Sequence, residues 1–352
     1  MKINRKNNFD LLRLTLAILI MISHSAGLSE NDLMLDIGNL INAKVAVDAF
    51  FIISGFLIFM SFENSSSIWS YTKKRAKRIL PGYIAVIVIC AVALSVVSVL
   101  KFAEYFTNKE FFQYIFFNLT TFNFLQPTLP GVFVDQRVQA INNPLWTIKV
   151  EIMFYIAVPI IGYIFSKINK VAAIAAIYLL SILYSTAIMQ LGDRLDPSFL
   201  IQLEQQLPGQ MAFFISGTLL YYFYEKFHNN SFIFLAISVL ILVIHNFAFE
   251  IYFLYPLAFA VTVIYFCLIV KYLGNFGKYG DFSYGIYIWH FPILQVFVHY
   301  QLFDRALIGI PLSYLCVFIA AYLSWNYIEK PFLNKRSHYV VAETKEKDFA
   351  TK

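Results

Sequence analysis

Ten stretches of this chain are apolar over about the length that a helix needs to cross a membrane, and this constrains the fold most. A spanning helix needs about 20 consecutive, mostly apolar residues. Hydrophobic residues make up 59% of the 352 residues and charged residues only 14%, whereas soluble domains are roughly 45–50% apolar and about 25% charged. We therefore expect an all-α integral membrane protein, with about ten transmembrane helices near residues 10–27, 45–62, 79–100, 147–166, 171–190, 210–224, 231–248, 250–270, 282–300 and 306–328.

The distribution of lysine and arginine predicts the orientation of these helices. With ten spans both termini share a side, and most of the 27 Lys and Arg residues fall in segments on that side. Because cytoplasmic segments carry the excess of Lys and Arg, we expect both termini to be cytoplasmic and the membrane to be the inner (plasma) membrane. The net charge of +6 then reflects topology, and we expect no nucleic-acid partner.

The segments between the spans suggest one domain and one short tail. We expect a polytopic membrane domain at residues 1–334 and a polar cytoplasmic tail at 335–352. The longest outer segment, about 101–146, contains "FFQYIFFNL" (111–119), which predicts a short interfacial helix. The three cysteines lie in apolar runs without metal-ligand spacing, so we expect neither a disulfide nor a metal site.

Ionisable residues within the predicted spans indicate where chemistry could occur, because such residues are costly in a membrane. His24 follows Arg13 by 11 residues, which is about 16 Å along a helix. Arg13 is thus expected near the inner surface and His24 in the outer half of the membrane. Asp48, Glu151 and His290 are expected at middle to outer depths in their own spans. A histidine beside carboxylates is suited to general-base catalysis.

On the inner side, Arg13 is joined by Arg75 and Arg78 of the basic run "KKRAKR" (73–78). Arginine clusters suit phosphate groups, because the guanidinium fork binds oxygens bidentately. Each feature alone has a simpler interpretation. Arg13 could snorkel to the interface, "KKRAKR" could be a topology signal, and Ser54-Gly55 could serve only close helix packing.

Several sequence blocks occur together and in order. Arg13 and His24 are separated by ten residues in the first span. The blocks that follow are "VDAFFIISGFLI" (47–58), "RAKRILPGY" (75–83), "LWTIKVEIMFYI" (145–156), "FSYGIYIWHFPI" (282–293) and "YIEKPF" (327–332). In these blocks the chain resembles acyltransferase family 3, the integral-membrane acyltransferases that modify extracellular glycans and related acceptors. The resemblance covers essentially the whole chain, with little signature in residues 170–280.

The resemblance implies an O-acyltransferase that takes an acyl group, most often acetyl, from acetyl-CoA as co-substrate. The implied acceptor is a hydroxyl of a glycan or a lipid-linked sugar, with membrane lipid as the surroundings. It implies His24 as the catalytic residue, and Arg13, Arg75 and Arg78 as donor-binding residues. In our mechanistic hypothesis, Glu151 or Asp48 orients His24, and His290, Tyr284 or Tyr287 donates to the oxyanion. Supporting positions are Ser54, Trp146, Ser283, Tyr284 and Tyr287.

Alternatives remain open from the sequence alone. An acyl-histidine relay fits as well as direct transfer. A proton-coupled transporter or flippase of a glycan precursor would also show buried ionisable residues in many spans. A non-catalytic component of a glycan assembly complex is a further alternative. A succinyl or other acyl donor fits these residues as well as an acetyl donor.

Overall fold

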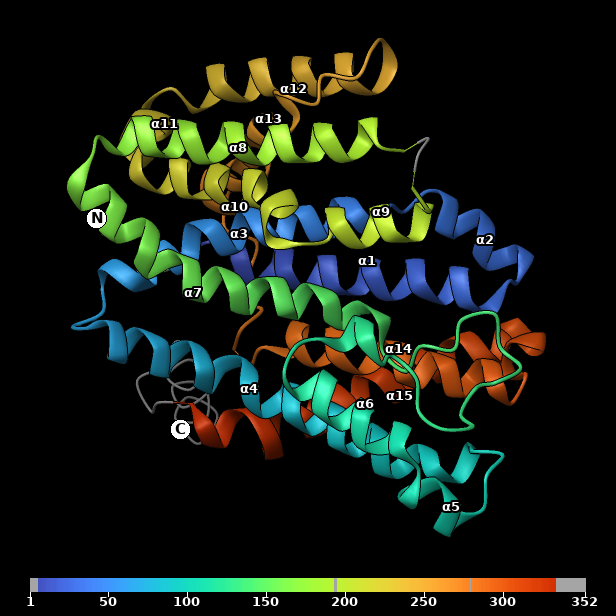
Figure 1. The fold of residues 1–352 in the computed structure, drawn as a ribbon. Coiled ribbons are helices and arrows are strands. Elements are labelled where there is room, and N and C mark those ends of the chain that lie inside the picture. The colour runs from blue at the N-terminus through green and yellow to red at the C-terminus, as the bar shows by residue number, and fades with distance from the viewer. Residues whose placement is uncertain (1–5, 193–194, 279, 334–352) are drawn as a thin grey trace, which may run out of the picture. The chain divides into compact units, whose positions relative to one another are not determined.

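The chain folds into helices throughout the part that the computed structural model describes, residues 6–192, 195–278 and 280–333 (Figure 1). No strand occurs among these residues. The helices are α1 (Phe9–Ser29), α2 (Asp32–Asn39), α3 (Ala43–Glu63), α4 (Ile68–Ala93), α5 (Phe102–Thr107), α6 (Lys109–Leu119), α7 (Trp146–Lys167), α8 (Lys170–Gln190), α9 (Pro197–Glu204), α10 (Leu207–Tyr222), α11 (Tyr224–Asn229), α12 (Ser231–Phe247), α13 (Tyr255–Leu268), α14 (Phe282–His299) and α15 (Ala306–Leu323).

Every predicted span overlaps one of these helices, and the all-helical prediction is confirmed. Six described segments are long and apolar enough to cross a membrane, namely Phe9–Ser29, Met34–Glu63, Ile68–Val97, Asn143–Lys167, Lys170–Gln190 and Leu302–Phe332. Helix α14 is not among the six, although it has 18 residues. Most of its residues are buried, and a helix surrounded by protein can carry polar side chains that lipid would not tolerate. The count of ten spans and the side of the termini stay predictions.

Helix α4 differs from the predicted span at 79–100. It begins at Ile68 and ends at Ala93, followed by a 3-10 turn at Leu94–Val97. The basic run 73–78 is therefore part of the helix and not a loop before it. Lysine, arginine and alanine are good helix formers, and no glycine or proline interrupts the chain between Ile68 and Leu80. The short helix predicted at 111–119 is confirmed as α6, whose first turn is capped by the Asn108 side chain.

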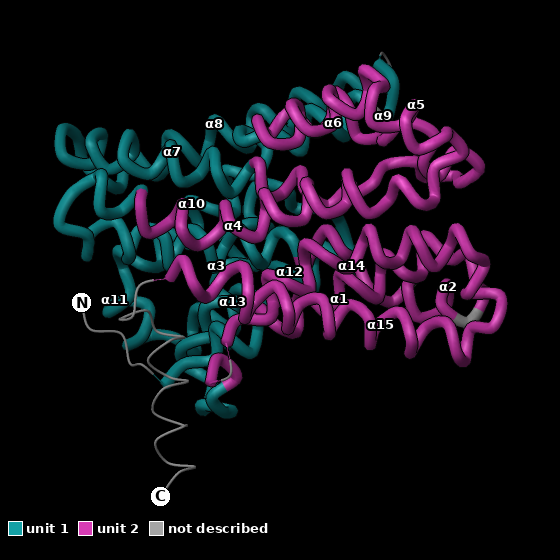
Figure 2. The backbone as a smooth tube through the Cα atoms, turned by 90° about the horizontal axis from the view of Figure 1, so that it is seen from below, with its two compact units in different colours: residues 1–12, 47–72, 150–275 teal, residues 13–46, 73–149, 276–352 magenta. Residues whose placement is uncertain are grey.

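The chain divides into two compact units (Figure 2). Unit 1 comprises residues 1–12, 47–72 and 150–275, and unit 2 comprises residues 13–46, 73–149 and 276–352. The predicted single membrane domain, 1–334, spans both units and stays a prediction. The tail predicted at 335–352 lies outside the described residues.

In unit 1, helices α3 and α10 pack backbone against backbone. A Cβ added at Gly55 would lie 1.8 Å from the carbonyl oxygen of Phe214, and one at Gly217 would lie 2.0 Å from that of Ile52. Only glycine allows this approach, which is common where membrane helices associate. The packing interpretation of Ser54-Gly55 is thus confirmed for the glycine.

In unit 2, helix α14 is the element on which other segments are anchored. Helix α15 runs beside it (Figure 1), with Gly285 against the backbone of Ala321. The amide nitrogen of Gln295 donates to the carbonyls of Val138 and Ala140, at 2.6 and 2.9 Å. The Asn142 side chain donates to the Ile288 carbonyl at 2.8 Å. These bonds fix the long segment before α7 to the helix that carries His290.

Candidate active site

Two predicted site residues of unit 2, His24 on α1 and His290 on α14, contact each other directly. The Nδ1 atom of His24 lies 2.8 Å from the Nε2 atom of His290. The ring planes differ by 5° and their centroids are 5.1 Å apart, so the hydrogen bond lies close to the plane of both rings. His290 is fully buried and His24 is partly buried. The sequence singled out both histidines but did not predict that they pair.

The second nitrogen of His290 sets the direction of this hydrogen bond. Its Nδ1 atom lies 3.1 Å from the Ile286 carbonyl oxygen, which can only accept, so we assign the ring proton of His290 to Nδ1. Nε2 of neutral His290 then accepts from the Nδ1–H of His24. The Nε2 atom of neutral His24 consequently carries a lone pair. In this arrangement the Nε2 atom of His24 can accept a proton.

The two predicted site tyrosines of α14 use their hydroxyl groups on neighbouring segments of unit 2. The Tyr284 hydroxyl donates to the Ile79 carbonyl at 2.8 Å. The Tyr287 hydroxyl contacts the Pro144 carbonyl at 3.1 Å and the Thr147 hydroxyl at 2.7 Å. These three contacts tie neighbouring segments of unit 2 to α14. The predicted oxyanion role of these tyrosines stays a prediction.

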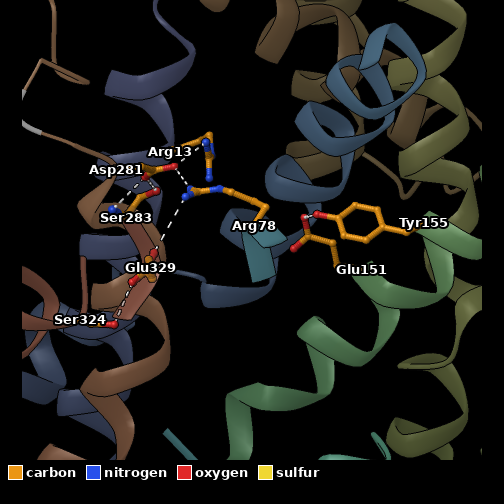
Figure 3. Close-up of polar contacts among 8 residues, drawn as sticks. All are labelled: Arg13, Arg78, Glu151, Tyr155, Asp281, Ser283, Ser324 and Glu329. Carbon is orange, nitrogen blue, oxygen red and sulfur yellow. Dashed lines mark hydrogen bonds and ion pairs between the residues drawn. The ribbon is translucent and has the colours of Figure 1, made fainter. Parts of the chain in front are cut away.

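A cluster of buried charges, defined by Arg13, Arg78, Asp281 and Glu329, lies elsewhere in unit 2 (Figure 3). Arg13 Nη1 is 2.8 Å from Asp281 Oδ2, and Arg78 pairs with the same oxygen. Arg78 Nη1 is also 3.9 Å from Glu329 Oε2. The two carboxylate side chains are only 6% and 1% exposed. Formally the two positive and two negative charges cancel, as buried charges must for stability.

Serine hydroxyls and aromatic rings complete this cluster. Ser283 donates from its backbone N–H, at 3.2 Å, and from its hydroxyl to Asp281, which caps the first turn of α14. The Ser324 hydroxyl donates to Glu329 at 2.8 Å (Figure 3). The Arg78 guanidinium lies 5.9 Å from the Tyr284 and Trp325 ring centres, within cation–π range.

Sequence reasoning missed Asp281 and Glu329 as members of the site. Asp281 directly precedes an apolar helix, and this pattern is explained by helix capping alone. The pattern therefore gave no reason to expect that Asp281 also pairs with arginine. Glu329 stood in the quoted block "YIEKPF", but its charge gave no indication of a partner more than 200 residues away. The predicted supporting residue Ser283 does contact this cluster. Arg75 lies one turn before Arg78 on α4 and is partly exposed.

The remaining predicted residues are distributed over both units. Asp48, Ser54 and Glu151 belong to unit 1, where Asp48 is buried and Glu151 accepts a hydrogen bond from the Tyr155 hydroxyl at 2.7 Å (Figure 3). The predicted action of Glu151 or Asp48 on His24 stays a prediction, as does the supporting role of Ser54. Trp146 belongs to unit 2 and begins α7. In the described part of the chain, no group of three or more His, Cys, Asp or Glu could hold a metal ion.

Helices of membrane-spanning length, together with buried ionisable side chains, define a polytopic membrane protein with polar sites inside its helical units. The sequence profile of acyltransferase family 3, described as an acyltransferase domain, matches residues 6–326. The chain therefore belongs to this family and is an acyltransferase.

Two relatives are similar to this chain in sequence. It is 28% identical to a protein named O-acetyl transferase from Shigella phage Sf6, over 95% of this chain and 98% of the relative. It is 29% identical to a protein named Nodulation protein 10 from Rhizobium leguminosarum bv. viciae, over 48% of this chain and 47% of the relative. No solved structure gives a significant match.

Proposed function

We propose that this protein is an O-acetyltransferase of the inner membrane, which moves an acetyl group from cytoplasmic acetyl-CoA to a sugar hydroxyl of a glycan or lipid-linked acceptor. The name of the phage relative, which is similar over nearly the whole length of both chains, supports the O-acetyl product. The observation that carries the proposal is the hydrogen-bonded pair of His24 and His290, because acyl transfer to a hydroxyl needs a group that accepts its proton.

In the proposed step, the lone pair on His24 Nε2 takes the proton of the acceptor hydroxyl as its oxygen attacks the thioester carbonyl. The carbon–sulfur bond then breaks, and the CoA thiolate leaves and recovers the proton from His24. His290 accepts the Nδ1–H of His24 throughout. It thereby fixes the ring orientation and stabilises the imidazolium, so His290 is a positioning residue.

The donor-binding part of the proposal rests on the charged cluster. Asp281 holds the guanidinium groups of Arg13 and Arg78 side by side. In the proposal, a phosphate of CoA competes with Asp281 and Glu329 for these groups, because the guanidinium fork binds phosphate oxygens bidentately. Arg75, one turn away on α4, adds a third positive charge on the same helix face as Arg78. In the predicted topology this end of α1 faces the cytoplasm, where acetyl-CoA is made.

The proposed function is tested by following the acetyl group. The purified protein in nanodiscs is incubated with acetyl-labelled acetyl-CoA and a membrane extract that contains lipid-linked glycans. We expect label in the glycan fraction that mild alkali releases, because O-acetyl esters hydrolyse under those conditions. Movement of the glycan lipid across proteoliposome membranes without label transfer would support a flippase instead and contradict the proposal.

A further inference from the structure

Unit 2 contains a cavity of about 360 Å³ that the catalytic proposal does not use. Its lining includes Leu28, Asp135, Gln136, Arg137, Gln295 and His299. The volume falls in the range of small-molecule sites, about 300–1,000 Å³. The cavity is therefore large enough for an organic ligand and not only for a single water molecule.

The cavity lies next to the histidine pair along both helices. Leu28 follows His24 by four residues on α1, and Gln295 follows His290 by five residues on α14. At 1.5 Å per residue these steps are about 6 and 8 Å. A ligand in the cavity thus lies one to two helical turns beyond the proposed base, on the side away from Arg13.

The cavity is rich in hydrogen-bond acceptors. Gln295 is fully buried, and its amide nitrogen is used by the carbonyls of Val138 and Ala140. Gln136 uses its amide nitrogen on the Gln295 carbonyl at 3.0 Å. The side-chain oxygens of Gln136 and Gln295 are buried, and neither has a hydrogen-bond partner among the described residues. A buried acceptor without a donor costs about 1–3 kcal/mol, so these oxygens favour a ligand or water that donates.

The charges around the cavity disfavour anions. The one arginine of the lining, Arg137, pairs with Glu30 at 2.7 Å and donates to the Gly27 carbonyl at 2.5 Å. Asp135 adds a carboxylate. Helices α1 and α14 both end here, and the C-terminal end of a helix carries partial negative charge. Hydroxyl donors are therefore favoured over phosphates and carboxylates.

We propose that this cavity binds a neutral, hydroxyl-bearing sugar ring of the acceptor, and that it discriminates against anionic sugars. The proposal rests on the proposed function, since it gives the acceptor a site separate from the arginines assigned to the donor. Ring hydroxyls supply the donors that Gln136 and Gln295 lack, and the bound ring lies one to two helical turns from His24.

The test measures sugar binding in the absence of acetyl-CoA. Saturation-transfer NMR on the full chain in nanodiscs compares methyl glycosides of glucose, galactose, rhamnose and N-acetylglucosamine with glucuronate and glucose 1-phosphate. We expect at least one neutral glycoside to bind and both anions to bind more weakly. We expect its Kd to rise about fivefold in Asp135→Ala and in Gln295→Leu.

The control is Gln139→Ala, which changes an exposed glutamine of the same segment that does not line the cavity. Asp135 is exposed, so Asp135→Ala keeps the test valid if Gln295→Leu fails to fold. Equal binding of neutral glycosides to wild type and Asp135→Ala, no binding at all, or equal binding of the anions would overturn the proposal and leave water as the occupant. Acetyl-CoA turnover by the wild type, measured in the same sample, tests the proposed function separately.

Discussion

At the scale of single residues, the proposed chemistry depends on the order in which two rings and one carbonyl share protons. The Ile286 carbonyl holds the proton of His290 on Nδ1, and His290 in turn accepts from His24. Replacing His290 by phenylalanine keeps an aromatic ring but removes the acceptor. We expect His290→Phe to lower kcat about tenfold to hundredfold, because His24 loses its fixed orientation.

The measurement for His290→Phe is steady-state kinetics over a range of pH. A positioning role predicts a fall in kcat with little change in KM for acetyl-CoA, and a displaced pH profile. His290→Gln, which can still accept a hydrogen bond, should recover part of the loss. An unchanged kcat in His290→Phe would show that the pair has no part in the reaction.

The charged cluster gives a second prediction at this scale. Asp281→Asn keeps the shape of the side chain but leaves Arg13 and Arg78 without their shared negative charge. Because the carboxylate is buried, we expect a loss of about 3–5 kcal/mol in the free energy of unfolding. Glu30→Gln removes an ion pair of the same unit whose side chains are 65% and 62% exposed, and should cost less than about 1 kcal/mol.

Thermal unfolding in detergent compares the two variants directly. Similar small shifts for Asp281→Asn and Glu30→Gln would mean that the cluster carries no stabilising charge pairing.

The cluster also shows which parts of the site could not be predicted from the sequence. Arg13, His24 and His290 could be singled out from the sequence as ionisable residues within apolar spans, and their depths in the membrane stay predictions. Asp281, Glu329 and the direct His24–His290 bond could not be predicted, because they depend on packing between segments that are far apart in the chain.

At the scale of elements, apolar length predicted a helix in each of the ten expected spans, but it did not predict the short helices α2, α5, α9 and α11. It was a poor signal for where α4 begins, because a basic run is compatible with both a loop and a helix. It also failed to separate α14 from lipid-facing helices, since its tyrosines, histidine and glutamine are accommodated by protein contacts. The apolar length of a segment depends only on its own residues. Whether a helix contacts lipid or protein depends on the other segments that pack around it.

The packing of α3 on α10 gives a prediction about elements. In Gly55→Ala the new methyl group would collide with the backbone of Phe214, which cannot rotate away as a side chain can. We expect destabilisation of about 1–3 kcal/mol or more. Gly27→Ala is the matched control, because a Cβ there meets no atom within 4 Å and alanine favours the helix.

Unfolding of both glycine variants in the same detergent provides the comparison. The expected order of stability is Gly27→Ala at or above wild type, and Gly55→Ala below it. Equal stability of the two variants would contradict the close approach of the two helices.

At the scale of the whole molecule, the predicted orientation can be tested by labelling. Lys109, in the long outer segment, and Lys170, in a predicted inner one, are both exposed. A cysteine at position 109 and a cysteine at position 170 should differ in their reaction with a maleimide that cannot cross the membrane. We expect Lys109→Cys to react in intact cells, and Lys170→Cys only after permeabilisation.

The protein used for this labelling should first lose its one partly exposed native cysteine. Cys90 and Cys267 are buried, whereas Cys316 is partly exposed, so Cys316→Ser removes the competing thiol. Reaction of both introduced cysteines from the same side would contradict the predicted alternation of spans and, with it, the cytoplasmic position of the proposed donor site.

The most direct test of the central claim measures acetyl-CoA turnover and acetyl-CoA binding on the same purified samples of wild type and His24→Gln. The control is His228→Gln, since His228 is exposed on α11. If His24 is the base, His24→Gln binds acetyl-CoA as the wild type does and loses about 10²-fold or more in turnover, whereas His228→Gln keeps both. Wild-type turnover in His24→Gln would contradict the account.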